Sequence, residues 1–418
     1  MNMYAVPEIS AGPNQQYWDL GLKCFNQGDN AQTALKTVWR RLPPPGDLNL
    51  LAAIVGNLYG DTFWSDQKLQ MDADLLAQYM NAATGINPPD CQRAANNAYR
   101  LWYGMLVRCN TSNDGLIPKT GSFTASPDVL INGLTTLDPY DMITKWDQTT
   151  WGPQPGLKNN TYGRGQNKNL QVPIKQGKIK IYFTSNGFNQ PPASWTQLFT
   201  YDGSKQTADL VNINDQKAIR PGERSACDTS FGFEPPGAGH YCLIVCAQTE
   251  YFSNDPASIS GANWNNGSSA HWITYNGAAG WHNVNVSQTG YEPLTFYNND
   301  DAPAQFRFVA RCRNVPEGSV VAMKVGDLGF EHSAKVTGED QEIFADIEVP
   351  ANYEGILNVE FPVLPAHASI SYSLIWRVAA NSASAEGLSK LVRDGYAAEV
   401  ADEILVVLGD THFVGEQS

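Results

Sequence analysis

Six histidines and seven cysteines are the residues best suited to chemistry in this chain, and their spacing fits no common catalytic or metal-binding pattern. The histidines are scattered and form no His-Glu-x-x-His pair. No Cys-x-x-Cys occurs, so the signatures of a zinc protease and of a zinc ribbon are both missing. A Gly-x-Ser-x-Gly elbow, a P-loop and a dinucleotide fingerprint are missing as well. The sequence leaves enzyme activity open and favours a protein without one.

The cysteines favour a structural interpretation. Cys242 and Cys246 stand four residues apart on one face of a predicted strand, so their Cα atoms would lie about 13 Å apart, too far for a disulfide. Because seven is an odd number, at least one thiol is free unless it pairs with another chain. We expect buried, reduced cysteines that pack as small apolar side chains.

Two acidic loops are candidates for a Ca²⁺ site. Asn254-Asp255 and Asn298-Asn299-Asp300-Asp301 offer the carboxylate and amide oxygens that Ca²⁺ prefers, provided that the loops meet at one end of a β-sandwich. Asn and Asp are also ordinary turn formers, so the Ca²⁺ ligands Asp255, Asp300 and Asp301 stay one of two interpretations. A pair of carboxylates for glycoside hydrolysis cannot be assigned, because their separation is a spatial quantity.

Large aromatic side chains in polar loops are the better candidates for a binding site. Trp264 lies in a loop rich in Gly and Asn, and Tyr275 and Trp281 flank a second such loop, 276–280. Aromatic residues on polar loops bind a sugar or a partner protein, or fold back to hold their own loop in place. Both alternatives stay open for these three residues.

Charge excludes one class of partner. The net charge is −14, and the excess lies in the last third, with 6 basic against 13 acidic residues in 289–381 and 2 against 7 in 382–418. Nucleic-acid binding needs a basic face, and we expect none. No apolar run is long enough for a transmembrane helix, and the first ten residues do not resemble a signal peptide. The protein therefore stays inside the cell, leaves by a leaderless route, or has had a leader removed.

Helical periodicity fills the first part of the chain, residues 1–122. Apolar stripes predict helices over 35–42, over 48–60 after a cap at Asp47, over 75–83 and over 99–106. Pro and Gly separate the stripes, which is typical of a small helical bundle. The aromatic stripe Tyr99, Trp102, Tyr103 and Leu106 is interpreted as bundle core.

After Gly115 the period changes to that of strands. Ile179, Ile181 and Phe183 share one face of a predicted half-buried strand, and further extended pieces are expected at 195–199, 270–274 and 281–286. The stretch 240–248 is apolar on both faces, so it predicts a central strand that is covered on both sides.

Residues 123–288 contain four short motifs, Ser126-Pro127-Asp128-Val129, 160–167, His240-Tyr241-Cys242-Leu243 and 283–286. Together they resemble the motifs of bacterial immunoglobulin-like modules of the cell-adhesion-related, CARDB-like kind. Ser126-Pro127-Asp128-Val129 is similar to the opening of such a module, and 160–167 resembles its Asn-x-Val-Tyr-Val-Arg-x-x-Asn strand. His240-Tyr241-Cys242-Leu243 is similar to its most specific strand, and 283–286 to its closing one. Gly163 and Gly165 depart from the pattern, which has β-branched residues there. The resemblance implies a β-sandwich accessory module of secreted or surface proteins, with no catalytic residues.

Strict alternation continues in residues 289–381. Phe306 and Phe308 share a face, Ile343 and Ile347 share another, and turn signals recur between the strands, as expected of a second immunoglobulin-like sandwich. In the acidic tail 382–418, a short helix is predicted over 386–401, and 404–409 is either a strand or a docking segment that packs on its own chain. The fold class is therefore multidomain α+β, with a helical bundle, two antiparallel sandwiches and an acidic C-terminal segment.

Three functions are consistent with these features. The preferred one is a non-enzymatic binding, adhesion or assembly protein that contacts a protein or glycan partner, with self-assembly left open. The second is an exported effector or toxin-like protein with its activity in the helical domain. The third is a polysaccharide-acting hydrolase with accessory sandwiches, for which no catalytic constellation is visible.

Overall fold

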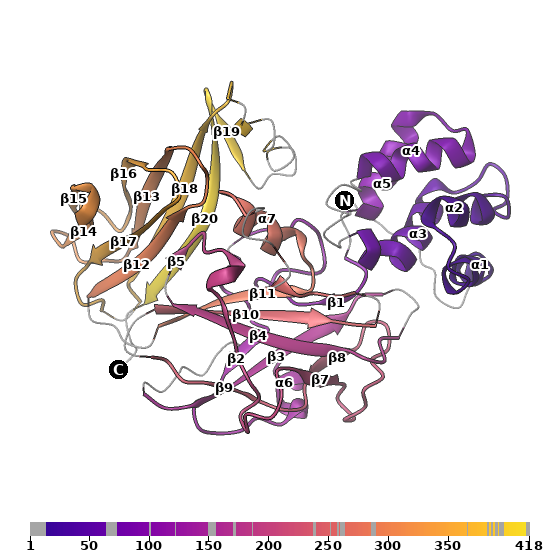
Figure 1. The fold of residues 1–418 in the computed structure, drawn as a ribbon, viewed down its shortest axis with the longest axis horizontal. Helices are drawn as coiled ribbons and strands as arrows, with labels where there is room; N and C mark the ends of the chain where they lie inside the picture. The colour runs from indigo at the N-terminus through magenta and orange to yellow at the C-terminus, as the bar shows by residue number, and fades with distance from the viewer. Residues whose placement is uncertain are drawn as a thin grey trace.

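The protein is an α+β multidomain chain in which an N-terminal helical region is followed by β-rich sheets (Figure 1). We call residues 14–99 the helical unit, 102–285 the first β unit and 290–414 the second β unit, and the last two together the β body. The computed structural model describes residues 14–63, 73–99, 102–121, 123–148, 156–169, 173–185, 187–236, 240–250, 252–256, 259, 264–285, 290–365, 367–382, 384–385, 388, 392 and 397–414. None of the helices in these ranges is both long and apolar enough to cross a bilayer.

The helical unit packs around one apolar core of its own. The buried members include Leu35, Val38, Leu51 and Met80, which confirms the predicted stripes on three of the helices. The Asp47 side chain accepts a hydrogen bond from the Leu50 backbone at 3.0 Å, so the predicted cap is also confirmed. The helices are α1 (Gln15–Asn26), α2 (Ala31–Trp39), α3 (Leu48–Phe63), α4 (Ala73–Thr84) and α5 (Pro88–Tyr99).

The predicted helix over 99–106 is wrong. Helix α5 ends at Tyr99, and Met105–Leu106 form strand β1 instead. The Trp102 ring packs over Gly277, where an added Cβ would lie 2.1 Å from it, and meets Phe252 edge-on at 5.5 Å. Trp102 and Leu106 of the aromatic stripe therefore belong to the core of the β body rather than to that of the helical unit.

The first β unit is a sheet of ten strands that folds over its own core, in the order β1-β3-β8-β7-β4-β10-β11 with β2, β6 and β9 attached beside it. Strand β10 pairs with β4 on one side and β11 on the other. Its elements are β2 (Val129–Ile131), α6 (Pro139–Thr144), β3 (Asn159–Asn167), β4 (Lys178–Ser185), η1 (Pro192–Ser194), β6 (Thr196–Gln197), β7 (Ala208–Val211), β8 (Arg224–Cys227), β9 (Phe231–Phe233), β10 (His240–Gln248), α7 (Ser268–Tyr275) and β11 (Ala279–Asn285).

Both faces of β10 are covered, as its apolar sequence predicts. Leu243 and Val245 face the main core of the β body, whereas Cys242, Ile244 and Cys246 face a second apolar cluster on the outer side. Residues 270–274 belong to helix α7 rather than to a strand, so that prediction is wrong. A helix fits there because its buried side, including Ala270 and Ile273, belongs to the apolar cluster on this outer face.

Gly163 explains one departure from the module-like motif. A Cβ at this position of β3 would lie 2.9 Å from Ile179 and 3.0 Å from Val245. The strands β4 and β10 therefore approach β3 so closely that a β-branched residue would clash, and only glycine fits.

The second β unit is a sandwich of two five-stranded sheets, β15-β14-β17-β12-β5 and β16-β13-β18-β20-β19. The predicted alternation is confirmed, since Phe306, Phe308 and Ile343 face the core. The segment 404–409 is part of β20, a strand paired with β18, so it does pack on its own chain. Residues 398–400 are a strand where a helix is predicted; most of 386–396 lies outside the described residues. The strands are β12 (Tyr291–Asn298), β13 (Ala304–Arg313), β14 (Val320–Val325), β15 (Phe330–Lys335), β16 (Asp340–Val349), β17 (Tyr353–Glu360), β18 (Ser369–Ala379), β19 (Ala398–Val400) and β20 (Glu403–Val414).

The two β units pack directly against each other along a contact that we call the seam. Strand β5 (Gly187–Phe188) branches from the first unit and pairs in parallel with β12 of the second. The Asn266 side chain accepts from Asn189 at 2.7 Å and donates to Asn298 at 2.7 Å. One apolar core runs through both units. Because a strand, a core and an amide network all cross the seam, the β body is one packed object.

Replacing Asn266 tests the seam. Asn266→Ala removes the acceptor of the Asn189 amide and the donor to Asn298 and Asp300 across the seam. We therefore expect the free energy of unfolding of the β body to fall by about 2 kcal/mol in a denaturant titration. Asn265→Ala is the matched control, because Asn265 is exposed and adjacent, and it should change stability by less than about 0.5 kcal/mol. Equal effects of the two substitutions would show that the Asn266 contacts contribute nothing.

Candidate functional site

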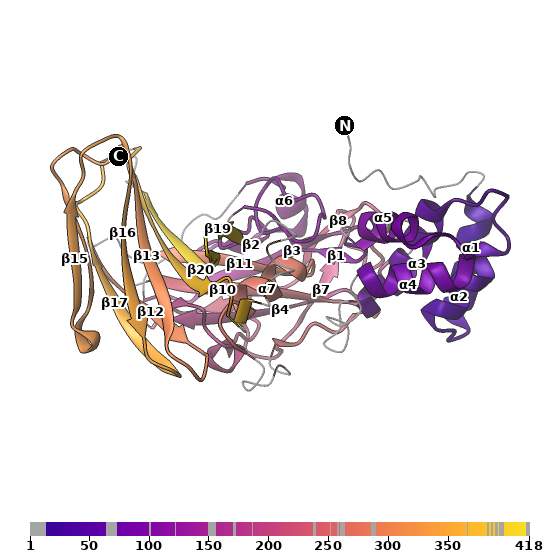
Figure 2. The ribbon, with the colours of Figure 1, turned by 90° about the horizontal axis from the view of Figure 1, so that it is seen from above.

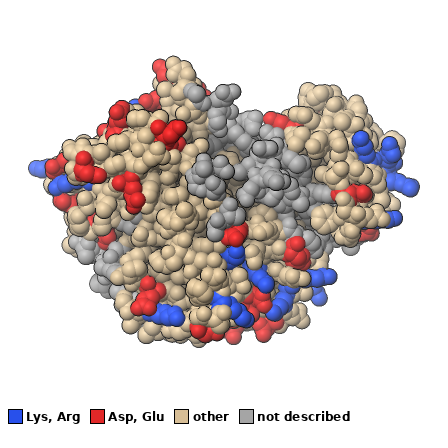
Figure 3. Space-filling view, in the orientation of Figure 1, with Lys and Arg blue, Asp and Glu red and all other residues tan. Residues whose placement is uncertain are grey.

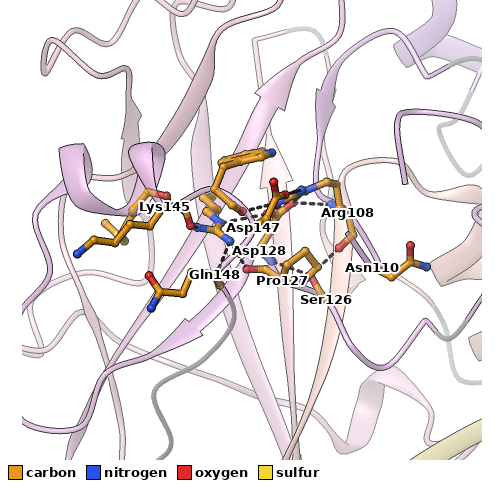
Figure 4. Close-up of polar contacts among 12 residues, drawn as sticks. Arg108, Asn110, Ser126, Pro127, Asp128, Lys145, Asp147 and Gln148 are labelled. Carbon is orange, nitrogen blue, oxygen red and sulfur yellow. Dashed lines mark hydrogen bonds and ion pairs between the residues drawn. The ribbon is translucent and has the colours of Figure 1, made fainter. Parts of the chain in front are cut away.

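The main cluster of buried charge surrounds Asp128, directly before β2 (Figure 4). This carboxylate is fully buried. It accepts from the backbone N–H of Arg108 at 2.7 Å, from the Arg108 guanidinium at 2.8 Å and from Nε of Arg164 at 3.1 Å. A buried carboxylate needs such charge-assisted bonds to offset the loss of water.

All five N–H groups of the Arg164 guanidinium, on β3, donate hydrogen bonds within the protein. One goes to Asp128, and the other four go to backbone carbonyls of Met142, Lys145, Pro127 and Gln148 at 2.8–3.1 Å. These carbonyls belong to α6, to the turn that follows it and to the segment before β2. Arg164 therefore ties an irregular stretch of chain to the sheet.

Arg108 completes the cluster. Its guanidinium also donates to the carbonyl of Trp146 and to the carboxylate of Asp147, both at 2.7 Å. Asp147 is the exposed member, with 69% of its side chain accessible, and its hydrogen bond from Arg108 holds the pKa of that carboxyl below its usual range. The ring of Trp146 lies 4.3 Å from the Arg108 guanidinium, a cation–π contact.

This arrangement is better suited to stabilising the fold than to catalysis or ligand binding. Asp128 and Arg164 are both inaccessible to solvent, and the protein itself occupies their bonding groups. A catalytic carboxylate or a substrate-binding arginine needs a free position that faces a ligand. We therefore interpret the cluster as the internal support of the first β unit.

The aromatic candidates are buried, as the alternative in which they fold back onto their own chain implies. Trp264, Tyr275 and Trp281 are only 5%, 1% and 4% exposed. Trp264 and Trp281 meet the ring of Trp195 edge-on at 6.2 and 5.4 Å, and Tyr275 stacks on His271 at 4.5 Å. Trp264 and Trp281, which is on β11, belong to the apolar cluster on the outer face of β10, whereas Tyr275 of α7 belongs to the main core of the β body. Contact of these three residues with a partner stays a prediction.

The side chains predicted as Ca²⁺ ligands bind different groups of the protein. Asp255 accepts from the Tyr182 hydroxyl at 3.1 Å and pairs with Lys180 at 3.3 Å. Both carboxylate oxygens of Asp300 accept from Asn266, at 3.0 and 3.1 Å, so this loop forms part of the seam. Within the described ranges, no three acidic, His or Cys side chains gather in the manner of a metal site. Ca²⁺ binding at Asp255, Asp300 or Asp301 stays a prediction.

Two further buried charged groups lie in the β body. Lys119 is 1% exposed, and its amine donates to the carbonyl of Ala279, which pairs with Cys246. Burial lowers the pKa of Lys119 to about 8. Glu292 on β12 is 2% exposed, and burial raises its pKa to about 7.

The thiols are inert by position. All seven cysteines are free and buried, as predicted. Burial raises the pKa of Cys109, and of Cys246 in the cluster under the tryptophans, so both remain protonated. They act as small apolar side chains rather than as nucleophiles.

Comparisons with known proteins give only weak similarities. No protein-family model and no curated protein sequence matches the chain. Red sea bream transglutaminase aligns at 9% identity over 64% of this chain and 30% of its own, with a TM-score of 0.15. The C-terminal domain of the Streptococcus agalactiae AgI/II polypeptide BspA aligns at 8% identity over 59% and 95%, with a TM-score of 0.17. CfaE, the adhesive subunit of the CFA/I fimbria of enterotoxigenic Escherichia coli, aligns at 8% over 75% and 94%, with a TM-score of 0.16. The chain thus spans less than a third of the transglutaminase, and the site must be interpreted from its own residues.

Sequence reasoning missed the charge cluster. It noted Ser126, Asp128 and Arg164 only as parts of a motif. Because β3 has a polar sequence and Asp128 lies before β2, no local pattern marks the two charged residues as buried. Glu292 did have a signal, because it breaks the alternation of β12 on the inward face. Nothing local marks Lys119, whose burial depends on segments far away in the chain.

Asp128→Asn tests the support role. The substitution leaves the buried Arg164 guanidinium without its charged partner and Arg108 with the exposed Asp147, so we expect a loss of about 3–5 kcal/mol in the free energy of unfolding. Asp147→Asn removes the exposed carboxylate from the same Arg108 and should cost less than about 1 kcal/mol. Chemical denaturation followed by tryptophan fluorescence measures both; a stable Asp128→Asn protein would refute this role.

Lys119 predicts a pH dependence of stability. Its pKa is lower in the folded chain than its ordinary value of 10.5, so the unfolded chain holds the proton more tightly between about pH 8 and 10.5. The free energy of unfolding should therefore rise across that window, by up to about 3 kcal/mol, in the wild type relative to Lys119→Met. Lys205→Met, at an exposed lysine, is the control and should run parallel to the wild type. If the difference in the free energy of unfolding between wild type and Lys119→Met did not change with pH, the buried amine would keep its ordinary pKa.

Proposed function

We propose that this chain is a non-enzymatic binding or assembly protein, in which the β body holds the helical unit out toward a partner protein. The observation that carries the proposal is that the chain itself occupies its strongest polar cluster: Asp128 and Arg164 have no exposed side-chain surface. A buried, saturated cluster supports a scaffold and offers nothing to a substrate.

The way in which the helical unit is attached supports the same function. It has a core separate from that of the β body. In the second view it lies at one end of the molecule, with the second β unit at the other (Figure 2). At the junction, Tyr103 packs on Gly56 of α3, where an added Cβ would lie 3.2 Å from the ring. A compact unit at the end of an elongated body is well placed to contact another molecule.

We include in the proposal that residues 123–288 form a module of the immunoglobulin-like, CARDB-like type that their sequence resembles. Its support is that the motif residues carry structure: Ser126 donates to the Arg108 carbonyl at 2.5 Å, and Asp128 and Arg164 pair. His240 lies at the seam, 3.0 Å from the hydroxyl of Thr411. A binding module with such a framework needs no catalytic residues. The burial of Trp264, Tyr275 and Trp281 removes the argument that these side chains bind either a glycan or a protein. The protein partner that we propose therefore rests on the helical unit.

An activity in the helical unit has less support. Its two thiols, Cys24 and Cys91, are buried, and the first histidine of the chain is His240. A Cys–His pair therefore cannot form within this unit.

Site-specific crosslinking tests the proposed function. A photoreactive residue at Gln78 or Asn96, both exposed on α4 and α5, should give a discrete crosslink to another protein in cells that carry the full chain. The same residue at exposed Lys205 on the β body is the control and should give none. Crosslinks from the control position alone, or from no position, would contradict a helical unit that contacts a partner.

A further inference from the structure

The chain carries two charged surfaces of opposite sign on different units. The first is the basic corner, which we define as Lys36, Arg40 and Arg41 at the end of α2. All three side chains are exposed, and within the described ranges no carboxylate forms an ion pair with any of them. Figure 3 shows Lys and Arg side chains gathered at the outer edge of the helical unit. The cations of this corner are therefore available to an external partner.

The second surface is the acidic end of the second β unit. The connections β12–β13, β14–β15 and β16–β17 all lie at one end of this sandwich, as the antiparallel pairing of β17 with both β12 and β14 requires. We define the acidic end as Asp301, Asp327, Glu348 and Glu354, all of which are exposed. Asp and Glu also dominate the face of the second β unit seen in Figure 3.

The carboxylates of the acidic end lack cationic partners in the described part of the chain. Asp327 accepts from the Tyr353 hydroxyl at 2.5 Å, Glu354 from the Tyr297 hydroxyl at 3.0 Å, and Glu348 from the Gln305 amide at 2.8 Å. Because these donors are neutral, they fix the positions of the carboxylates without neutralising their negative charge. Elsewhere on the same sandwich, Arg307 and Arg377 both neutralise Asp346, so the outer face of the sheet is balanced and the end is not.

We infer that the partner of this chain includes a second copy of itself: the basic corner of one copy docks on the acidic end of the next. The inference rests on the proposed function and names its partner. Complementary charge on the two surfaces steers the encounter and fixes its orientation.

The geometry of this contact is head to tail. The two surfaces belong to different units, which lie at opposite ends of the molecule in Figure 2. A pair of copies joined through two different patches still has one free patch of each kind, so further copies can add until a ring closes or an open chain grows. We therefore expect chains or rings rather than a limited symmetric dimer.

Light scattering of the purified full chain, whose mass is 45.8 kDa, tests the inference. At about 20 mM salt the average mass should rise with protein concentration, and at about 0.5 M salt, where charges are screened within a few ångströms, it should return to one copy. Arg40→Glu/Arg41→Glu and Asp301→Lys/Glu354→Lys should each remain at the mass of a single copy at low salt. Lys205→Glu, which reverses an exposed cation outside both surfaces, should associate like the wild type.

Mixing the two reversed variants makes the test specific. Each keeps one intact surface, and the intact surfaces complement each other, so the mixture should regain association that neither variant shows alone. Each of three results would overturn the inference, provided that circular dichroism shows folded protein. They are a wild type whose mass stays constant at low salt, variants that associate like the wild type, and a mixture that stays at the mass of one copy. If the crosslinks from Gln78 or Asn96 persist in that case, only the self-partner is wrong and the proposed function stands.

Discussion

The bonding of Asp128 to two arginines is the interaction on which the first β unit depends. A fully buried carboxylate is costly, and two guanidiniums with a backbone N–H offset that cost. Arg164 also binds three carbonyls in and after α6 and the carbonyl of Pro127 before β2, and Arg108 also binds Trp146 and Asp147. Segments without regular structure thereby gain fixed positions against β3. The same saturation that makes the cluster a good support removes it from any reaction.

The first β unit, which this cluster supports, is packed continuously against the second β unit. Strand β10 shares its inner face with the main core and its outer face with the tryptophan cluster, and β5 and Asn266 join the second β unit to the first. Two β units connected in this way do not act as independent spacers. They form a single body that fixes the distance between the helical unit at one end and the acidic end of the second unit, which is what a head-to-tail contact requires.

Local patterns predicted much of the fold and little of the candidate site. Alternation located β4, β13 and β16, and helical stripes located α2, α3 and α4, because these patterns reflect one face buried against a core. The predictions for residues 99–106 and 270–274 were wrong because both structures depend on distant parts of the chain. Trp102 and Leu106 pack in the main core of the β body, whereas α7 covers the outer face of β10. Trp264 looked exposed since its neighbours are Asn265 and Asn266, yet Asn266 is polar because it bonds across the seam. The burial of Asp128 and Lys119 likewise depends on contacts between residues far apart in sequence.

Native-state hydrogen exchange on the full chain tests most directly the claim that the β body is one object. The account predicts that the slowest amide protons of β10 in the first unit and of β13 in the second open with the same free energy and the same denaturant dependence, as parts of one cooperative unit. The helical unit, with its own core, should open separately. If β13 exchanged at a clearly lower free energy than β10, the two β units would unfold independently, and the rigid body proposed here would be contradicted.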